Sequence, residues 1–143
     1  MLTLPRKILA AMLRHGLEQK PNECCGFLCA DKDRFVKLLV AADNIDKSTI
    51  TFRIGPKATE SAYRLADERG LDVVCIYHSH TESTPVPSIA DVYQANASLM
   101  TYDPDFRWII MGLRDPDHPI MKAYRITGDG YEETGLTVVD GSP

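Results

Sequence analysis

The stretch YHSHTESTPVPSIAD, residues 77–91, places two histidines one residue apart and follows them with a serine and an aspartate. If His78 and His80 lie on a strand, their side chains point to the same face and both imidazoles can reach one ion. Zinc binds imidazole nitrogen and carboxylate oxygen at about 2.0–2.2 Å, and Asp91 can supply the carboxylate. Two histidines and one carboxylate leave a fourth position for water, whose pKa zinc lowers toward about 7. The spacing therefore predicts a catalytic zinc site at His78, His80 and Asp91.

The same stretch has a second interpretation, because Ser88 and Asp91 have nearly the spacing and types of a helix capping box. In that motif Ser88 accepts a hydrogen bond from a backbone amide, and Asp91 reaches back to another amide. Taken alone, such a pair is more often a helix cap than part of a metal site. The paired histidines at the end of a buried strand favour the metal site, and both interpretations stay open at this point.

Strands and helices must position these side chains. Residues 71–80 predict a strand, and its near-continuous apolar run indicates burial on both faces, as at the centre of a sheet covered by helices. The histidines therefore emerge where a central strand ends. Apolar residues at helical spacing predict helices over 5–20, with Thr3 as a start signal, over 56–70 and over 88–100. Further strands are predicted over 24–30, 34–43, 48–54, 107–113, 120–126 and 134–140.

This element order predicts a mixed β-sheet flanked by helices, an α+β fold with three α/β/α layers. The chain has 143 residues, 44% of them hydrophobic and 25% charged, which fits a single domain over residues 1–143. A net charge of −4 with sixteen scattered Lys and Arg argues against nucleic acid as a partner. No apolar run reaches the roughly 18 residues of a membrane span, and the N-terminus lacks signal-peptide features, so we expect a cytoplasmic protein without a membrane partner. The sequence leaves the oligomeric state open.

Other enzyme classes fit these residues less well. Zinc deaminases combine His-x-Glu, which His80 and Glu82 could supply, with a later Pro-Cys-x-x-Cys, but no cysteine follows Cys75. The His-x-His-x-Asp-His motif of metallo-β-lactamase-like hydrolases is not matched in its last two places. A cysteine hydrolase needs an accessible thiol, whereas the four cysteines flank or lie in apolar strands and are predicted to be buried: Cys24, Cys25, Cys29 and Cys75. His15 and His118 are predicted to be surface residues.

Residues 78–91, read as His-x-His, seven residues, Ser, two residues, Asp, resemble the metal-binding motif of the JAMM (MPN-plus, Mov34/PAD-1) metalloproteases. The segment PNECCGFLCA, residues 21–30, resembles an early segment of that family, and the order of elements resembles it over nearly the whole chain. The resemblance implies a JAMM/MPN fold, in which a cytidine-deaminase-like mixed sheet is flanked by helices. It implies His78, His80 and Asp91 as the ligands of Zn²⁺. It further implies that Glu23 takes a proton from water and passes it to the leaving amine, while Ser88 supports the oxyanion. Without the resemblance, Glu23 would be one acidic residue among twenty.

Thr81 departs from the family pattern, because many JAMM members have proline directly after the second histidine. This form resembles small bacterial members that trim ubiquitin-like sulfur-carrier proteins with a Gly-Gly C-terminus, which implies such a carrier as the partner. The implied reaction is hydrolysis after Gly-Gly, with release of cysteine or a short cysteine-containing peptide. Two alternatives stay open: an isopeptidase that removes a ubiquitin-like modifier from lysine, and a catalytically silent scaffold. The carrier's extended tail could pair with a sheet edge, for which residues 48–56 are the candidate.

Overall fold

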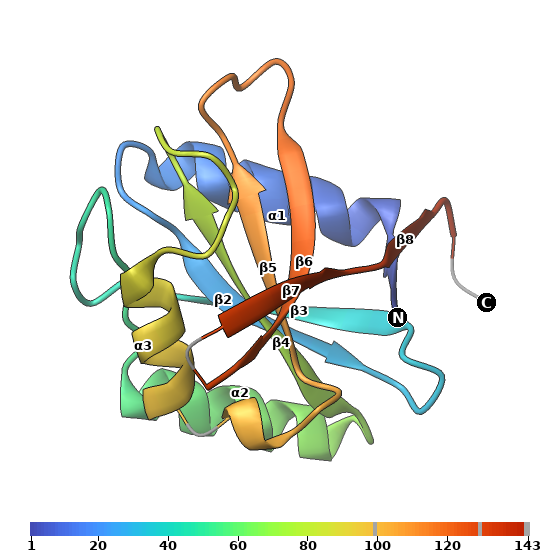
Figure 1. Ribbon diagram of the computed structural model, residues 1–143. Helices are drawn as coiled ribbons and strands as arrows, with labels where there is room; N and C mark the ends of the chain where they lie inside the picture. The colour runs from blue at the N-terminus through green and yellow to red at the C-terminus, as the bar shows by residue number, and fades with distance from the viewer. Residues whose placement is uncertain (99, 129, 142–143) are drawn as a thin grey trace.

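Six strands form one mixed sheet, and helices lie against both of its faces (Figure 1). The computed structural model describes residues 1–98, 100–128 and 130–141. Along the chain the elements are β1 (Leu2–Pro5), α1 (Arg6–Gln19), β2 (Cys25–Ala30), β3 (Val36–Ala42), α2 (Pro56–Glu68), β4 (Asp72–His80), α3 (Ile89–Ala97), a 3₁₀ turn (Met100–Tyr102), β5 (Arg107–Gly112), β6 (Ile120–Thr127), β7 (Gly130–Thr134) and β8 (Leu136–Val139). The strand order is β3-β2-β4-β5-β6-β7, in which β4 and β5 are parallel and the other neighbours are antiparallel. A separate parallel pair joins β1 to β8.

Two apolar clusters, one on each face of the sheet, hold the layers together. Helix α1 and strand β1 cover one face, where Met12 and Leu4 pack against side chains of the central strands. Helices α2 and α3 cover the opposite face, to which they contribute Ala62, Ala66 and Ala95. The predicted α+β fold, a mixed sheet in three α/β/α layers, is therefore confirmed.

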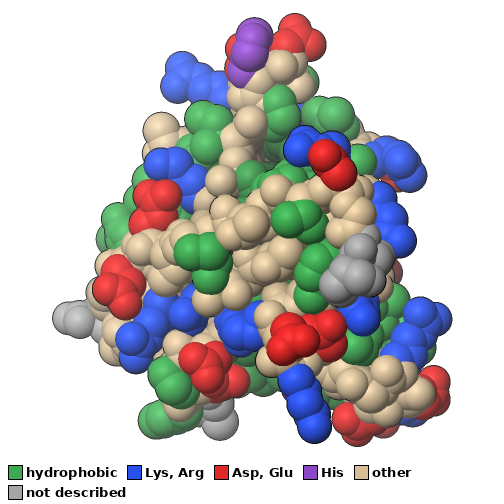
Figure 2. Space-filling view, turned by 90° about the vertical axis from the view of Figure 1, so that its right-hand side faces the viewer, with side chains coloured by type: hydrophobic (Ala, Val, Ile, Leu, Met, Phe, Trp, Pro, Cys, Tyr) green, Lys and Arg blue, Asp and Glu red, His purple; other side chains and the backbone are tan. Residues whose placement is uncertain are grey.

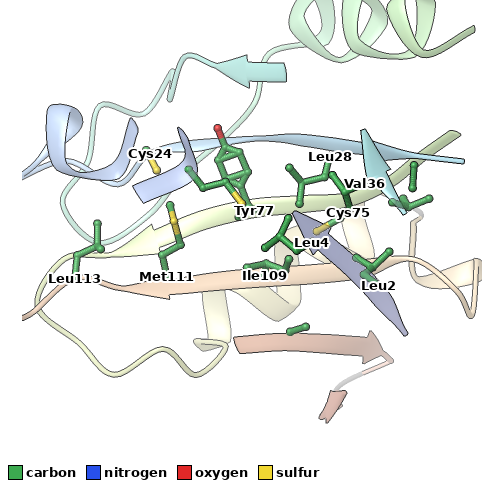
Figure 3. Close-up of a cluster of buried hydrophobic side chains, with 14 residues drawn as sticks. Leu2, Leu4, Cys24, Leu28, Val36, Cys75, Tyr77, Ile109, Met111 and Leu113 are labelled. Carbon is green, nitrogen blue, oxygen red and sulfur yellow. The ribbon is translucent and has the colours of Figure 1, made fainter. Parts of the chain in front are cut away.

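Strand β4 lies between β2 and β5 and is buried along almost its whole length, as its apolar run predicted. Cys75 and Tyr77 belong to the cluster beneath α1, which Figure 3 shows together with Ile109 of the neighbouring strand. Because side chains alternate along a strand, His78 and His80 point to the other face, the one that α2 and α3 cover. The end of β4 thus places two histidines in the buried layer between the sheet and helices α2 and α3.

His15 is half-buried, which differs from the surface position that the sequence predicted. Its Nδ1 lies 2.8 Å from the hydroxyl of Tyr77, and the two rings meet edge to face. Since Tyr77 is fully buried, its hydroxyl needs a polar partner, and helix α1 supplies one. Burial also lowers the pKa of His15. His118 is exposed, as predicted, and pairs with Asp115 at 3.0 Å.

The predicted strand over residues 48–54 is wrong, because this segment is a loop. Its apolar and polar residues alternate with the period of a strand, but its backbone groups bind elsewhere. The side chain of Asn44 donates to Thr51 O at 2.9 Å and accepts from the Arg53 amide at 3.1 Å. The Glu23 amide also donates to Ser48 O and the Ile45 amide to Arg53 O. Scattered contacts of this kind take the place of a neighbouring strand, and residues 48–56 do not form the sheet edge that was predicted for a substrate tail.

Short strands near the chain ends also differ from prediction. Thr3 lies in β1 rather than marking the start of a helix, and β7 forms between the strands predicted over 120–126 and 134–140, where no strand was predicted. Strands of four or five residues owe their stability to their partners more than to their own residues, so their sequences carry little signal. The predicted helix over 88–100 ends at Ala97. Leu99 of that prediction and residues 129 and 142–143 lie outside the described residues.

The surface shows no large field of one charge on the face that Figure 2 displays, where Lys and Arg side chains are interspersed with Asp and Glu. Exposed pairs such as Arg6 with Asp140, at 2.7 Å, bring opposite charges together. Within the described ranges, no helix combines the length and apolar character needed to cross a membrane.

All four thiols should be unreactive in the folded protein. Each cysteine is buried, and burial raises the pKa of Cys24 and Cys29 to about 11 and that of Cys25 to about 12. Because the thiolate is the reactive form, we expect labelling by a disulfide reagent at neutral pH to be on the order of 100-fold slower in the native than in the denatured protein. Peptide mapping after a short pulse would identify the modified residue, and fast labelling of any native thiol would contradict this packing.

Candidate metal centre

The end of β4 and the first turn of α3 bring three potential metal ligands together. The Nε2 atoms of His78 and His80 lie 3.2 Å apart. The Asp91 carboxylate contacts both rings, with 3.2 Å from Oδ1 to His78 Nε2 and 3.0 Å from Oδ2 to His80 Nε2. All three residues are buried. The structure therefore places the three predicted ligands in mutual contact.

A backbone carbonyl fixes the orientation of His80. Its Nδ1 lies 2.7 Å from Thr84 O, and because a carbonyl only accepts, Nδ1 carries the proton. In neutral His80 the Nε2 lone pair then faces an oxygen of Asp91, and the two repel unless a proton or a cation lies between them. Burial lowers the pKa of His80, but hydrogen bonds to Asp91 and Thr84 outweigh burial and raise it, which favours a proton in this position.

Ser88 and Asp91 do form a helix capping box, the competing interpretation of the sequence. Ser88 Oγ accepts from the Asp91 amide at 3.1 Å, and the Ser88 amide donates to Asp91 Oδ2 at 2.9 Å. Because the same carboxylate faces both histidines, the cap does not exclude a metal site, and the two interpretations are compatible. Burial alone would raise the pKa of Asp91, but the charge of His78 and hydrogen bonds from His78, His80 and the Ser88 amide lower it well below its usual range.

Strand pairing brings Glu23, distant in sequence, to the same place. Strand β2 runs antiparallel to β4 with Cys25 opposite His78, so Glu23, just ahead of β2, lies level with His80 at the end of β4. Glu23 is 2% exposed, and its Oε1 has no hydrogen-bond partner among the residues that the structure describes. Burial raises the pKa of Glu23 to about 8, with smaller effects from His80, which lowers it, and Asp91, which raises it. A buried carboxyl with a displaced pKa beside this cluster is a candidate for proton transfer.

Asn44 and Thr81 hold the segments around Glu23 in place through hydrogen bonds. The sequence did not identify either residue as a structural support. The Asn44 side chain donates to Glu23 O at 3.0 Å and to Thr51 O at 2.9 Å. The Thr81 hydroxyl donates to Pro21 O at 3.2 Å, which ties the residue after His80 to the turn before β2. These contacts join residues that are far apart in the chain, so no local pattern could reveal them. Thr81 stood out only as a departure from the family motif.

The donor atoms and their spacing are compatible with zinc. Two ligands at about 2.0–2.1 Å from a tetrahedral ion lie about 3.3 Å apart. Here the two Nε2 atoms are 3.2 Å apart, and each lies 3.0–3.2 Å from one oxygen of Asp91. Imidazole nitrogen and carboxylate oxygen are ligands that zinc accepts. A cation between these atoms would also remove the repulsion between the His80 lone pair and Asp91.

A mixed sheet in three layers, with this cluster at the end of its central strand, defines a protein of the JAMM/MPN class. The family match agrees: the profile of the prokaryotic homologs of the JAB domain matches residues 5–127. The chain belongs to this family and is a JAMM-type enzyme. The matched range includes Glu23 as well as the cluster of His78, His80 and Asp91.

Relatives of known name cover most of the chain. It is 27% identical over 141 residues to the CysO-cysteine peptidase of Mycobacterium tuberculosis, across 97% of this chain and 92% of the relative. The desampylase of Haloferax volcanii is 31% identical over 143 residues, across 96% of each chain. A probable TtuB-protein conjugate cleaving protease of Thermus thermophilus is 28% identical over 95 residues, 66% of this chain and 63% of the relative. The solution structure of a Desulfitobacterium hafniense protein matches with a TM-score of 0.87 at 28% identity, over 99% of this chain and 94% of that one.

Removing one histidine from the cluster should abolish stable zinc binding. We expect His80→Ala to weaken zinc binding on the order of 100-fold or more, since loss of a mere outer-shell partner already costs about 10–100-fold. Zinc content after loading and desalting, measured by atomic emission, gives the result. His118→Ala is the matched control, because that histidine is exposed and, among the described residues, the one polar partner of its side chain is Asp115. Full zinc occupancy in His80→Ala would mean that the ligands lie elsewhere.

Proposed function

We propose that this protein is a zinc-dependent peptidase that hydrolyses the bond after the C-terminal Gly-Gly of a ubiquitin-like sulfur-carrier protein, releasing cysteine or a short cysteine-containing peptide. The observation that carries the proposal is the contact of His78, His80 and Asp91, with the buried carboxyl of Glu23 level with them across the sheet. In a single small region the chain offers three metal ligands and a proton carrier.

In this proposal His78, His80 and Asp91 hold the ion through Nε2, Nε2 and the carboxylate. Zinc would supply a Lewis acid that polarises the scissile carbonyl and lowers the pKa of a water at its open position. Glu23 accepts the proton of the attacking water and then delivers it to the leaving amine. Its carboxyl suits both roles, because its pKa is raised to about 8 by burial in the metal-free protein and a nearby cation draws a carboxyl pKa down again.

Ser88 has a hydrogen left to donate in this mechanism. Its oxygen accepts from the Asp91 amide as the helix cap, and no acceptor for its O–H is found among the described residues. The hydroxyl can therefore donate to the oxygen that gains negative charge when water attacks the carbonyl. The cap fixes the position of this donor before the substrate arrives, so orienting it costs little during the reaction.

The surface beside the cluster supports a protein as the substrate. Ile89 and Tyr93, on the helix that carries Asp91, are 93% and 74% exposed. Both line a surface hollow together with Ser88 and Tyr131. Apolar side chains grouped at a site commonly mark contact with another protein. The name of the Mycobacterium tuberculosis relative, CysO-cysteine peptidase, supports cysteine as the group that leaves the carrier.

The second candidate is an isopeptidase that removes a ubiquitin-like modifier from lysine with the same site. The Thermus thermophilus relative favours it, because its name describes cleavage of a protein conjugate. The chemistry is the same in both cases, hydrolysis of an amide after the modifier's C-terminus. Only the group on the amine side of the bond differs.

Glu23→Gln should separate metal binding from turnover. Glutamine keeps the size of the side chain but cannot accept the proton, so we expect zinc content to stay unchanged while kcat falls by about 10²–10⁴-fold. Zinc analysis and carrier cleavage measured on the same preparation provide both values. Unchanged turnover would exclude Glu23 from proton transfer, and lost zinc would point to a role as ligand or structural support instead.

The intact mass of the carrier tests the substrate. A carrier ending Gly-Gly-Cys should lose the mass of one cysteine residue when incubated with the zinc-loaded protein, because the water consumed stays in part on the new C-terminus. It should stay intact when a chelator has removed the zinc or when Glu23→Gln replaces the wild type. A carrier linked through Gly-Gly to a lysine side chain, run in parallel, tests the isopeptidase. Cleavage of the lysine conjugate alone would replace the first proposal by the second, and cleavage of neither by a zinc-loaded sample would overturn both.

A further inference from the structure

The two histidines of the cluster are held in different ways. His80 has its Nδ1 against Thr84 O, and a hydrogen bond of this kind is the usual support for a histidine that binds metal. The Nδ1 of His78 is buried, yet it has no hydrogen-bond partner among the residues that the structure describes. The Nε2 of His78 faces Asp91 Oδ1 at 3.2 Å, which holds one edge of the ring. Torsion about the bond from Cβ to an aromatic ring is broad, so one polar contact at one edge leaves the plane of the ring free to tilt. A second contact is needed to fix the plane of His78.

Phe52 makes that contact. Its ring stacks on the imidazole of His78, with the centroids 4.3 Å apart and the planes inclined by 25°. Both side chains are buried. We propose that Phe52 is a positioning residue that fixes the plane of His78 by stacking, in place of the hydrogen bond that orients His80. The inference rests on the proposed function in one respect, the assignment of His78 as a metal ligand.

The loop that carries Phe52 is itself anchored. Asn44 binds Thr51 O and the Arg53 amide, the backbone groups on either side of Phe52. The side chain of Gln94 donates to the carbonyl oxygen of Phe52. Gln94 belongs to α3, the helix that also supplies the carboxylate of the cluster. The backbone of Phe52 is therefore held by Asn44 and by Gln94 of α3, and a residue that positions another side chain needs such a fixed backbone.

Stacking should act on metal affinity as well as on geometry. An imidazole that binds a cation takes up part of the positive charge, and the face of an aromatic ring attracts positive charge. The contact is therefore stronger when His78 is metal-bound than when it is free and neutral. An interaction that favours one state shifts the equilibrium toward that state, here toward the bound metal. A leucine at position 52 would fill similar space without offering this face.

Three variants test the role through zinc affinity. We expect Phe52→Leu to weaken zinc binding about 10-fold, in the range found for loss of an outer-shell partner, and to change the visible absorption of the Co²⁺-loaded protein. Phe52→Tyr keeps the aromatic ring, so its zinc affinity and Co²⁺ absorption should match those of the wild type. Phe52 borders a cavity of about 230 Å³, which offers space for the added hydroxyl. Ile50→Ala is the control, because Ile50 lies in the same loop but is 75% exposed. Affinity is measured by competition with a chromophoric chelator, and thermal melts confirm that each variant is folded.

A measurement on the metal-free protein separates this inference from the proposed function. The ring protons of His78 should carry a ring-current shift from Phe52 in NMR spectra, which Phe52→Leu removes and Ile50→Ala leaves in place. Unchanged His78 shifts in Phe52→Leu would overturn the stacking, and altered shifts with zinc affinity within twofold of the wild type would overturn the positioning role. If the wild type shows the shift but binds no zinc or Co²⁺, the stacking stands and the assignment of a metal site fails.

Discussion

Hydrogen bonding between β2 and β4 aligns Cys25 with His78, and the polar side chains of the site take their places from this register. Because side chains alternate, a shift of β4 by one residue would turn both histidines into the apolar layer beneath α1. Ser79, between the histidines, points to the opposite face, where its Oγ accepts from the Cys24 amide at 2.8 Å. The residue that separates the two potential ligands thus joins β4 to the segment that carries Glu23. The predicted metal ligands His78 and His80 and the proposed proton carrier Glu23 therefore depend on one pairing of strands.

The pairing of β2 with β4 brings together buried polar groups, and placing them side by side costs free energy unless a cation lies between them. Two imidazoles, a carboxylate and the Glu23 carboxyl are withdrawn from water, and burying such groups is costly unless each finds a partner. Part of this requirement is met by the hydrogen bonds that raise the pKa of His80 and by the cap that holds Asp91. Glu23 Oε1 and His78 Nδ1 still lack partners among the described residues. A bound cation would turn repelling atoms into ligands, so metal binding and stability are coupled here.

How much of this the sequence could predict depends on how local each signal is. Alternation along a strand places His78 and His80 on one face, and the Ser-x-x-Asp spacing predicts the cap, because both patterns span a few residues. Glu23 needed the family resemblance, since its relation to His80 arises only from the pairing of strands that are far apart in the chain. The loop at 48–54 misled the prediction for the same reason. Its alternating residues look like a strand, but Asn44 and Gln94 satisfy its backbone, and Phe52 packs on a histidine instead of a sheet neighbour.

Asp91 connects the folding of α3 to the chemistry of the site. Its Oδ2 accepts from the Ser88 amide and also faces His80, while Oδ1 faces His78. The positive end of the helix favours the ionised carboxylate there, in addition to the hydrogen bonds that lower its pKa. The carboxylate is therefore oriented and charged before any metal arrives, which reduces the cost of organising the ligands. Asp91 is therefore a poor position for separating stability from metal binding, because loss of its carboxylate removes the half of the capping box that the Ser88 amide donates to, together with a predicted ligand. His80 lies at the end of a strand and has no capping role, so its loss affects the cluster more selectively.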